Sequence, residues 1–248
     1  MELFGWLRGL KEKTLYYPGC LTKGILKQEF ENYKEIFNRL GIDYVMVPKN
    51  EVCCGLPVIN AGFRKDAKNL AIKNFGIFKK IGITKIVTSC PSCYHTFNEI
   101  YPKFIPSWDI KVEHASVTIL RALKKKRIKY KGSEEDRVSV SYHDPCHLGR
   151  YSGIYDEPRQ VIELLGGKIL ELKNNRENAI CCGGGGGLRA NYPDFAKKIA
   201  KKRVEYLDSE AQKIISPCGL CHANLKSATE KSVEFSTFVL SRLRGMGR

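Results

Sequence analysis

The ten cysteines of this chain form two sets of five with almost the same spacing, and this repeat constrains the fold more than any other feature of the sequence. In each set a single cysteine is followed by an adjacent pair and then by a C-x-x-C motif. Corresponding cysteines are 126 residues apart at the first position and 128 apart at the other four. A repeat of this kind indicates an internal duplication. We therefore expect two related halves, residues 1–126 and 127–248.

The segments around the cysteines repeat as well. Runs rich in β-branched residues at 14–17 and 138–142 lead to the first cysteine of each half, and the runs at 85–88 and 213–215 lead into C-x-x-C. The same alternation predicts further strands at 44–47 and 168–172, helices at 25–40, 64–80, 158–165 and 193–206, and a closing strand and helix within 111–123 and within 233–243. Strands alternating with helices at this spacing predict parallel sheets built from β-α-β units. The expected fold is therefore α/β, with two pseudo-symmetric Rossmann-like halves joined by the polar segment 124–137.

All ten cysteines lie at or just after the ends of predicted strands. In open α/β sheets, ligands bind at the carboxyl ends of the strands. The cysteines of each half are therefore expected to converge on one edge of its sheet, where they offer five thiols to a single site.

Five thiols are more than most kinds of cysteine site require. A structural zinc ion takes four Cys or His ligands and would leave one cysteine idle in each half. A thioredoxin-type dithiol would explain C-x-x-C but not the adjacent pairs, and a disulfide scaffold is neither needed at this length nor maintained in the cytosol. Iron–sulfur ligation suits dense, unpaired cysteines, although neither half has the C-x-x-C-x-x-C-x-x-x-C-P run of a ferredoxin. A zinc-binding interaction module stays open at this point.

The doubled pattern C-x(31–38)-CCG-x(34–35)-C-x-x-C resembles that of the cysteine-rich CCG domain family over residues 14–243. The segments DPCH at 144–147 and CCGG at 181–184 are similar to the family's second motif almost letter for letter. Members include the B-type subunit of heterodisulfide reductase, the catalytic part of its D-type subunit, and iron–sulfur subunits of complexes that oxidise glycerol-3-phosphate, glycolate or lactate. The first motif reads CCGLP rather than the CCP frequent in the B-type protein, which favours the D-type and oxidase branch.

The resemblance implies a non-cubane 4Fe–4S cluster in each half, held by five cysteines of which one bridges two irons. This accounts for the fifth cysteine of each set. Carried over to this chain, one cluster would be held by Cys20, Cys53, Cys54, Cys90 and Cys93, and the other by Cys146, Cys181, Cys182, Cys218 and Cys221.

The resemblance also implies an oxidoreductase that reduces a disulfide, such as the heterodisulfide of coenzyme M and coenzyme B, between the two clusters. Each cluster would take one sulfur and deliver one electron. The alternative is an electron-transfer subunit of a flavin-linked complex that oxidises lactate, glycolate or glycerol-3-phosphate. Because the sequence lacks a ferredoxin module, we expect electrons to arrive through a ferredoxin-like iron–sulfur partner, similar to the C-type protein of heterodisulfide reductase, and a flavin-containing subunit.

Residues beside the cysteines supply further candidates. Three histidines could donate a proton to a product thiolate, and three basic residues could attract an anionic substrate. The histidines are His143, His147 and His222, and the basic residues are Lys23, Arg150 and Arg189. Each of the six could instead serve only as a structural hydrogen-bonding or capping group. We expect His95 and His114 to be structural.

The chain carries a formal net charge of +16, which predicts either an anionic partner or a lysine-rich solvated surface. Its basic residues are spread along the sequence without a nucleic-acid-binding motif, so we expect a small anionic disulfide substrate and no nucleic acid. The sequence has neither an apolar run long enough to span a bilayer nor a signal peptide. It is therefore expected to be cytoplasmic and not an integral membrane protein. Candidates for docking the electron-donor partner are Leu3, Phe4, Trp6 and Leu7.

Overall fold

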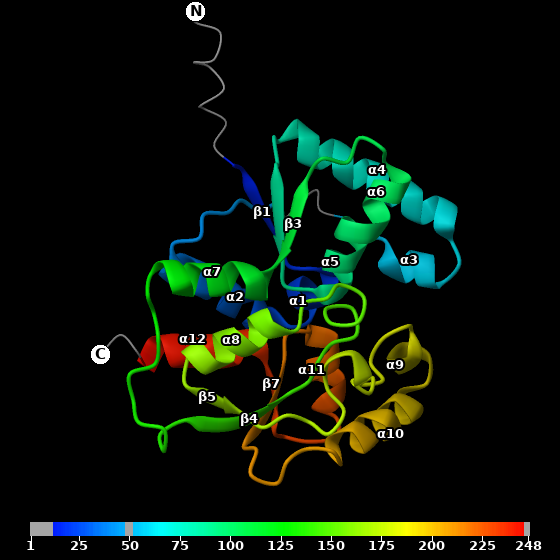
Figure 1. Cartoon of the computed structure of the whole chain (residues 1–248). Coiled ribbons are helices and arrows are strands. Elements are labelled where there is room, and N and C mark those ends of the chain that lie inside the picture. The colour runs from blue at the N-terminus through cyan, green and yellow to red at the C-terminus, as the bar shows by residue number, and fades with distance from the viewer. Residues whose placement is uncertain (1–11, 48–51, 246–248) are drawn as a thin grey trace, which may run out of the picture.

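The computed structural model describes residues 12–47 and 52–245. This part of the chain forms two parallel β-sheets surrounded by helices (Figure 1), which confirms the expected α/β fold. Within the described residues, none of the helices combines the length and the apolar character that crossing a bilayer requires. The apolar residues expected to dock a partner lie outside the described residues; they are Leu3, Phe4, Trp6 and Leu7.

The first half contains a three-stranded parallel sheet. Its strands are β1 (Thr14–Tyr17), β2 (Lys85–Thr88) and β3 (Lys111–His114), in the order β1-β2-β3. The central strand β2 is buried along its whole length, as expected for a strand with neighbours on both sides. The helical segments of this half are α1 (Cys20–Gly24), α2 (Lys27–Leu40), α3 (Leu56–Asn60), α4 (Arg64–Lys80), α5 (Pro91–His95), η2 (Thr96–Ile100), α6 (Tyr101–Phe104) and α7 (Ala115–Lys125).

The second half repeats this arrangement with one more strand. Its sheet has the order β5-β4-β6-β7, and the strands are β4 (Val138–Tyr142), β5 (Gly167–Ile169), β6 (Lys213–Ser216) and β7 (Ser232–Glu234). Every pairing in this sheet is parallel. The helical segments are α8 (Asp156–Leu164), η3 (Arg176–Asn178), α9 (Leu188–Asn191), α10 (Pro193–Val204), α11 (Gly219–Leu225) and α12 (Phe235–Gly245).

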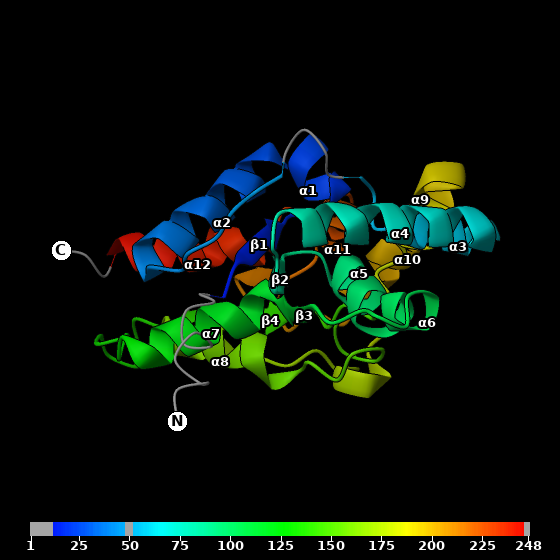
Figure 2. The same cartoon turned by 90° about the horizontal axis from the view of Figure 1, so that it is seen from above.

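A layer of four helices lies between the two sheets. Helix α2 packs against α12, and α7 packs against α8, so that each pair joins the first half to the second (Figure 2). One continuous hydrophobic core runs through this layer and includes Tyr16 and Phe37 from the first half and Val140 and Phe238 from the second. Because the halves share this core, their two sheet edges are held in a fixed relation to each other.

Two local expectations need correction. The strand expected at 44–47 is reduced to a single parallel bridge between Leu15 and Val45, in which Val45 exchanges hydrogen bonds with the carbonyl of Thr14 and the N–H of Tyr16. The helix expected over 25–40 is present as α2 (27–40), but a separate short helix that was not expected, α1, precedes it and begins at Cys20. The first cysteine of the first half therefore starts a helix rather than preceding one.

Candidate functional site

In the first half, the cysteines sit where strands give way to helices. Cys20 begins α1 three residues after β1, and Cys90 is the N-cap of α5 just after β2. Cys53 and Cys54 directly precede Gly55, the N-cap of α3. These positions bring the five thiols of the first set to the same end of the sheet.

The five thiols of the first set form one connected group. Cys20 hydrogen-bonds to Cys53, which also contacts Cys54. The sulfur atoms of Cys54 and Cys93 lie 3.5 Å apart, and Cys93 in turn hydrogen-bonds to Cys90. The hydrogen bond from Cys20 and that from Cys54 lower the pKa of Cys53 to about 2, and Gly55 adds an N–H bond to the same sulfur at 3.4 Å.

The second set repeats these contacts. Cys146 hydrogen-bonds to Cys181, which also contacts Cys182. The sulfur atoms of Cys182 and Cys221 lie 3.2 Å apart, and Cys221 hydrogen-bonds to Cys218. Backbone N–H groups approach here too: Gly183 donates to the sulfur of Cys181 at 3.3 Å and Gly184 to that of Cys182 at 3.4 Å.

Each set is suited to a positively charged metal centre. Hydrogen bonding to the neighbouring thiol, burial and repulsion raise the pKa of Cys54 and of Cys182 to about 12, while Cys53 and Cys181 are held as thiolates. Without added positive charge, only some of the thiols in a set can therefore be ionised at once. Iron–sulfur clusters are held by thiolates and supply that charge. Five donors fit such a cluster, whereas a structural zinc ion would use four.

Glycine is required at position 19, where the backbone passes close to two cysteines of the first set. Gly19 has φ of 82°, and a Cβ atom there would lie 2.9 Å from Cβ of Cys90 and 3.3 Å from Sγ of Cys93. Any larger residue would both strain the backbone and push against two cysteines of the set. The glycine that directly precedes Cys20 is therefore required by packing.

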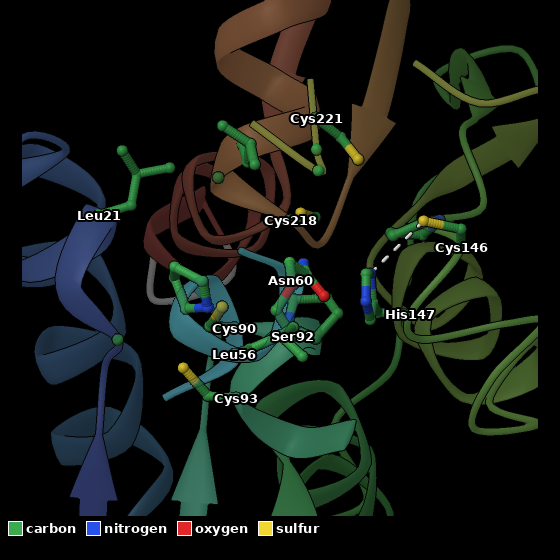
Figure 3. Close-up of a pocket in the computed structure, with 18 of the residues that line it drawn as sticks. Leu21, Leu56, Asn60, Cys90, Ser92, Cys93, Cys146, His147, Cys218 and Cys221 are labelled. Carbon is green, nitrogen blue, oxygen red and sulfur yellow. Dashed lines mark hydrogen bonds between the residues drawn. The ribbon is translucent and has the colours of Figure 1, made fainter. Parts of the chain in front are cut away.

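The two cysteine sets face a common cavity. Its volume is about 490 Å³, and nine of the ten cysteines line it; Cys53 is not among them. Its walls come from both halves: Leu56, Asn60 and Ser92 lie on the first, and His147 and Cys218 on the second (Figure 3). A molecule in this cavity would lie between the two sets of thiols.

Comparison with known proteins identifies the family. The profile of the cysteine-rich domain named CCG matches residues 14–98 and again residues 140–226. The chain belongs to the CCG family. Each match contains one of the two cysteine sets, so the duplication seen in the spacing is a duplication of the CCG domain.

Relatives of this CCG chain include subunits of oxidoreductases and iron–sulfur proteins. It is 34% identical to the D subunit of the dihydromethanophenazine:CoB–CoM heterodisulfide reductase of Methanosarcina acetivorans, a match that covers 87% of this chain and 54% of the relative. It is 32% identical to an iron–sulfur protein of Methanocaldococcus jannaschii, covering 90% and 43%, and 29% identical to the EtfAB:quinone oxidoreductase of Syntrophomonas wolfei, covering 88% and 33%. The chain spans about half or less of the length of these relatives. Their names support an iron–sulfur redox role and membership of a complex.

The three candidate histidines occupy different places. His147 lines the cavity, and its Nδ1 atom lies 3.5 Å from the sulfur of Cys146. Its ring also packs against His95 and Tyr151, with centroids 5.7 Å and 5.2 Å away, and burial together with His95 lowers its pKa. His95 therefore contributes to the surroundings of the cavity through His147.

The other two histidines are buried behind the second cysteine set. The Nδ1 atom of His143 accepts a hydrogen bond from Arg203, and burial lowers the pKa of His143 to about 3. The Nδ1 atom of His222 lies 3.1 Å from the Ser232 hydroxyl, and burial lowers the pKa of His222 as well. Neither ring is among the described residues that line the cavity. As proton donors, these two stay predictions.

The three basic residues expected to attract an anion are likewise absent from the described lining of the cavity. The guanidinium group of Arg150 donates to the backbone carbonyls of Glu177 and Ala179 and so fixes the loop that leads to Cys181. Lys23 lies in α1 and Arg189 in α9, close to the cysteines in sequence. Their role toward a substrate stays a prediction.

Two buried asparagines were not among the candidates predicted from the sequence. The side chain of Asn74 on α4 donates to the carbonyl of Cys53 at 3.1 Å and to the Tyr101 hydroxyl at 2.9 Å. That of Asn224 on α11 donates to the carbonyl of Cys182 at 2.7 Å. Both therefore hold the backbone of a cysteine pair. Only their position on the buried face of an amphipathic helix could have indicated this role.

Proposed function

We propose that this chain reduces an anionic disulfide in the cavity between two non-cubane 4Fe–4S clusters, one held by each five-cysteine set. The observation that carries the proposal is the convergence of two duplicated thiol sets on one cavity. Cleaving a disulfide to two thiols takes two electrons and two protons, and when bound, the clusters supply the electrons. A pseudo-symmetric pair of sites offers this chemistry to both sulfur atoms of the substrate.

The residues of the cavity wall suit a disulfide. Leu21 and Leu56 from the first half and Leu220 from the second give it an apolar lining, which keeps water away from the reacting sulfurs. Asn60 adds a polar group at the same wall. His147 is the candidate histidine that lines the cavity, so we assign to it the protonation of a product thiolate.

A heterodisulfide such as that of coenzyme M and coenzyme B is the substrate we favour. Support comes from the resemblance of the motifs and from the relative whose name is that of a heterodisulfide reductase D subunit. The net charge of +16 suits a small molecule with acidic groups. We further propose a ferredoxin-like iron–sulfur donor of the C type and a flavin-containing subunit as partners, in the cytoplasm, where thiols are kept reduced.

One relative favours a second function. The EtfAB:quinone oxidoreductase of Syntrophomonas wolfei matches 88% of this chain, and its name indicates transfer of electrons toward a quinone. It favours the alternative of an electron-transfer subunit in a flavin-linked complex; the resemblance of the motifs suggests one that oxidises lactate, glycolate or glycerol-3-phosphate. In that case the cavity would hold no disulfide during turnover.

The deciding experiment is an iron and acid-labile sulfide assay on protein purified without oxygen, followed by EPR during titration with a heterodisulfide. Two 4Fe–4S clusters correspond to about eight irons per chain. Full iron with a substrate-dependent EPR signal supports disulfide reduction. Full iron with an unchanged signal supports the electron-transfer alternative, and zinc in place of iron contradicts both.

A further inference from the structure

Arg203 on α10 is a buried cation with unsatisfied hydrogen-bond donors. Its relative accessibility is 0%. Its Nε atom donates to Nδ1 of His143 at 3.2 Å, while Nη1 and Nη2 are buried and have no hydrogen-bond partner in the described part of the chain. An arginine stays protonated in proteins, so a full positive charge lies beside the second cysteine set with two of its three nitrogens unsatisfied.

The carboxylates of this region are engaged elsewhere. The two oxygens of Asp144 accept bonds from Arg159 at 2.7 and 2.9 Å, and Glu171 accepts two more from the same guanidinium group. Among the described residues, Arg203 forms no salt bridge of its own. Burying a charge without a partner is strongly destabilising in proteins. The remaining neighbours of opposite sign are Cys182 and Cys221, once they are thiolates.

His143 links Arg203 to the second cysteine set. One ring nitrogen of His143 and the sulfur atoms of Cys182 and Cys221 all lie within 4.8 Å of one another. Because Nδ1 accepts the bond from Arg203, the single proton of the neutral ring is on Nε2. The ring is then a hydrogen-bond donor rather than a metal ligand, and the guanidinium group fixes that tautomer.

The first cysteine set has no such cation among the described residues. Tyr17, three residues before Cys20, stands where His143 stands before Cys146, and its hydroxyl donates to a backbone carbonyl at 2.6 Å. The groups that hold the cysteine pair, Asn74 and Tyr101, are neutral. Within the described part of this half, the one buried Lys or Arg is Lys85. It is paired with a glutamate at 3.2 Å and begins β2, whereas the C-x-x-C motif follows the end of that strand.

We propose that Arg203, acting through His143, makes the second cluster the more easily reduced of the two. A fixed positive charge beside a redox centre favours its more negative, reduced state, and the low dielectric of a buried site strengthens the effect. The proposal rests on the cluster sites of the proposed function, but it does not depend on the disulfide substrate. Arg203 is thus a positioning residue that makes duplicated sites electrostatically unequal.

The test is a redox titration of the anaerobically purified full chain, followed by EPR and absorbance. The signal of the second cluster is identified in a variant in which Cys53→Ser and Cys54→Ser disable the first site. Three substitutions are then compared. Arg203→Met removes the charge at similar length, and Arg203→Lys keeps it. Lys202→Met removes the neighbouring exposed cation, which is paired with Glu205, the C-cap residue of α10.

The expected result is a midpoint potential of the second cluster that is higher than that of the first, and that falls in Arg203→Met. It should stay near the wild-type value in Arg203→Lys and Lys202→Met, and the first cluster should not change in any variant. If Arg203→Met loses the iron of the second site, the test rests on the wild type and Arg203→Lys, in both of which the second cluster should keep its iron and the higher midpoint potential. Equal potentials in the wild type, an unchanged second cluster in Arg203→Met, or equal iron loss in Arg203→Met and Arg203→Lys overturns it. An iron content that is already low in the wild type instead counts against the proposed clusters.

Discussion

The hydroxyl of Tyr33 on α2 donates a hydrogen bond of 3.0 Å to Oε1 of Glu234, a residue 201 positions later at the end of β7. Both side chains are buried in the region where the two halves meet. The other carboxylate oxygen accepts bonds from the N–H and the hydroxyl of Ser236. Burial, together with repulsion from Glu29, raises the pKa of Glu234 from 4.5 to about 7 in spite of these bonds.

The raised pKa of Glu234 predicts a stability that falls as pH rises. Between its unfolded pKa near 4.5 and its folded pKa near 7, the folded chain binds the proton more tightly, so the free energy of unfolding decreases across this window. One pKa unit corresponds to about 1.4 kcal/mol, so the contribution of this group is at most a few kcal/mol. Glu234→Gln keeps the neutral shape, since its amide can accept from Ser236 and donate to Tyr33. We expect this variant to be more stable than the wild type above pH 7.

Chemical unfolding of both proteins between pH 5 and pH 8 checks this prediction. The difference in the free energy of unfolding should grow toward pH 8. Tyr33→Phe is the control: it leaves a carboxylate oxygen of Glu234 without its donor and should destabilise the fold by about 1–3 kcal/mol. Parallel curves for the wild type and Glu234→Gln would contradict the assignment.

We expect Asn74 to support iron binding in the first half only, and Asn224 in the second half only. Replacing Asn74 by Ala removes the donor to the carbonyl of Cys53 and to the Tyr101 hydroxyl, which costs about 1–3 kcal/mol for buried groups left unpaired. The cysteine pair of the first half then loses its support, so we predict that Asn74→Ala lowers the iron content at the first set alone. Asn224→Ala should do the same at the second set.

Iron per chain and the two EPR signals report these effects separately. Asn74→Asp is the stricter form of the test, because it places a carboxylate oxygen against the carbonyl of Cys53 in a fully buried position. Its loss of iron should exceed that of Asn74→Ala. Equal loss from both halves in any of these variants would show that the asparagines act on overall stability and not on a local cysteine pair.

Gly19 and Gly24 lie at the two ends of α1 and should respond oppositely to alanine. At Gly19, alanine meets Cys90 at 2.9 Å and adopts a backbone conformation that costs of order 1–3 kcal/mol for other residues. At Gly24, nothing lies within 4 Å of the added Cβ, and alanine within a helix is more stable than glycine by roughly 0.5–1 kcal/mol. We expect Gly19→Ala to lose iron from the first set and Gly24→Ala to keep all of it. An iron assay and thermal unfolding of both variants test this prediction. Full iron in Gly19→Ala would show that the backbone at position 19 is not tightly packed against Cys90.

The sequence predicted the parts of this site that depend on local pattern. Strands that run into Cys90 and Cys218 could be read from β-branched residues, and their convergence follows from parallel pairing. The segment 44–47 has the same composition, but it forms no strand. Only Val45 pairs with β1, through the carbonyl of Thr14 and the N–H of Tyr16. Pairing of this kind depends on tertiary contacts that composition does not encode.

The burial of Arg203 could not be predicted from the sequence. It belongs to a basic run at the end of α10, and such runs usually lie on a solvated face. Helical periodicity does place it on the same face as Ala196 and Ala200, both of which are fully buried. A buried charge is nevertheless stable only beside an anionic group. The groups near Arg203 that can supply it are the thiolates of Cys182 and Cys221, which are about 20 residues away in the sequence. The contrast between the two halves at this position was therefore visible only in the structure.

His147 is the residue we expect to affect turnover without affecting cluster content. It lines the cavity, and its ring packs against those of His95 and Tyr151, which also contact each other. His147→Phe keeps an aromatic ring for this packing but removes the proton donor. General acid catalysis contributes typically about 10²–10⁴-fold to a rate, so we predict a loss of that order in disulfide reduction with iron unchanged. Tyr151→Phe is the matched control, since the hydroxyl it removes belongs to a side chain that is 53% exposed.

This prediction is tested by measuring the rate of heterodisulfide reduction with a chemical electron donor, together with the iron content of each variant. Imidazole added to His147→Phe should restore part of the rate, because it replaces the missing acid, and it should leave Tyr151→Phe unchanged. If His147→Phe retains its iron and its rate stays within about twofold of the wild type, His147 does not protonate the product, because the loss of a general acid lowers the rate much more than twofold. The proton would then have to come from another source, such as water or one of the two histidines whose rings lie outside the described lining of the cavity, His143 and His222.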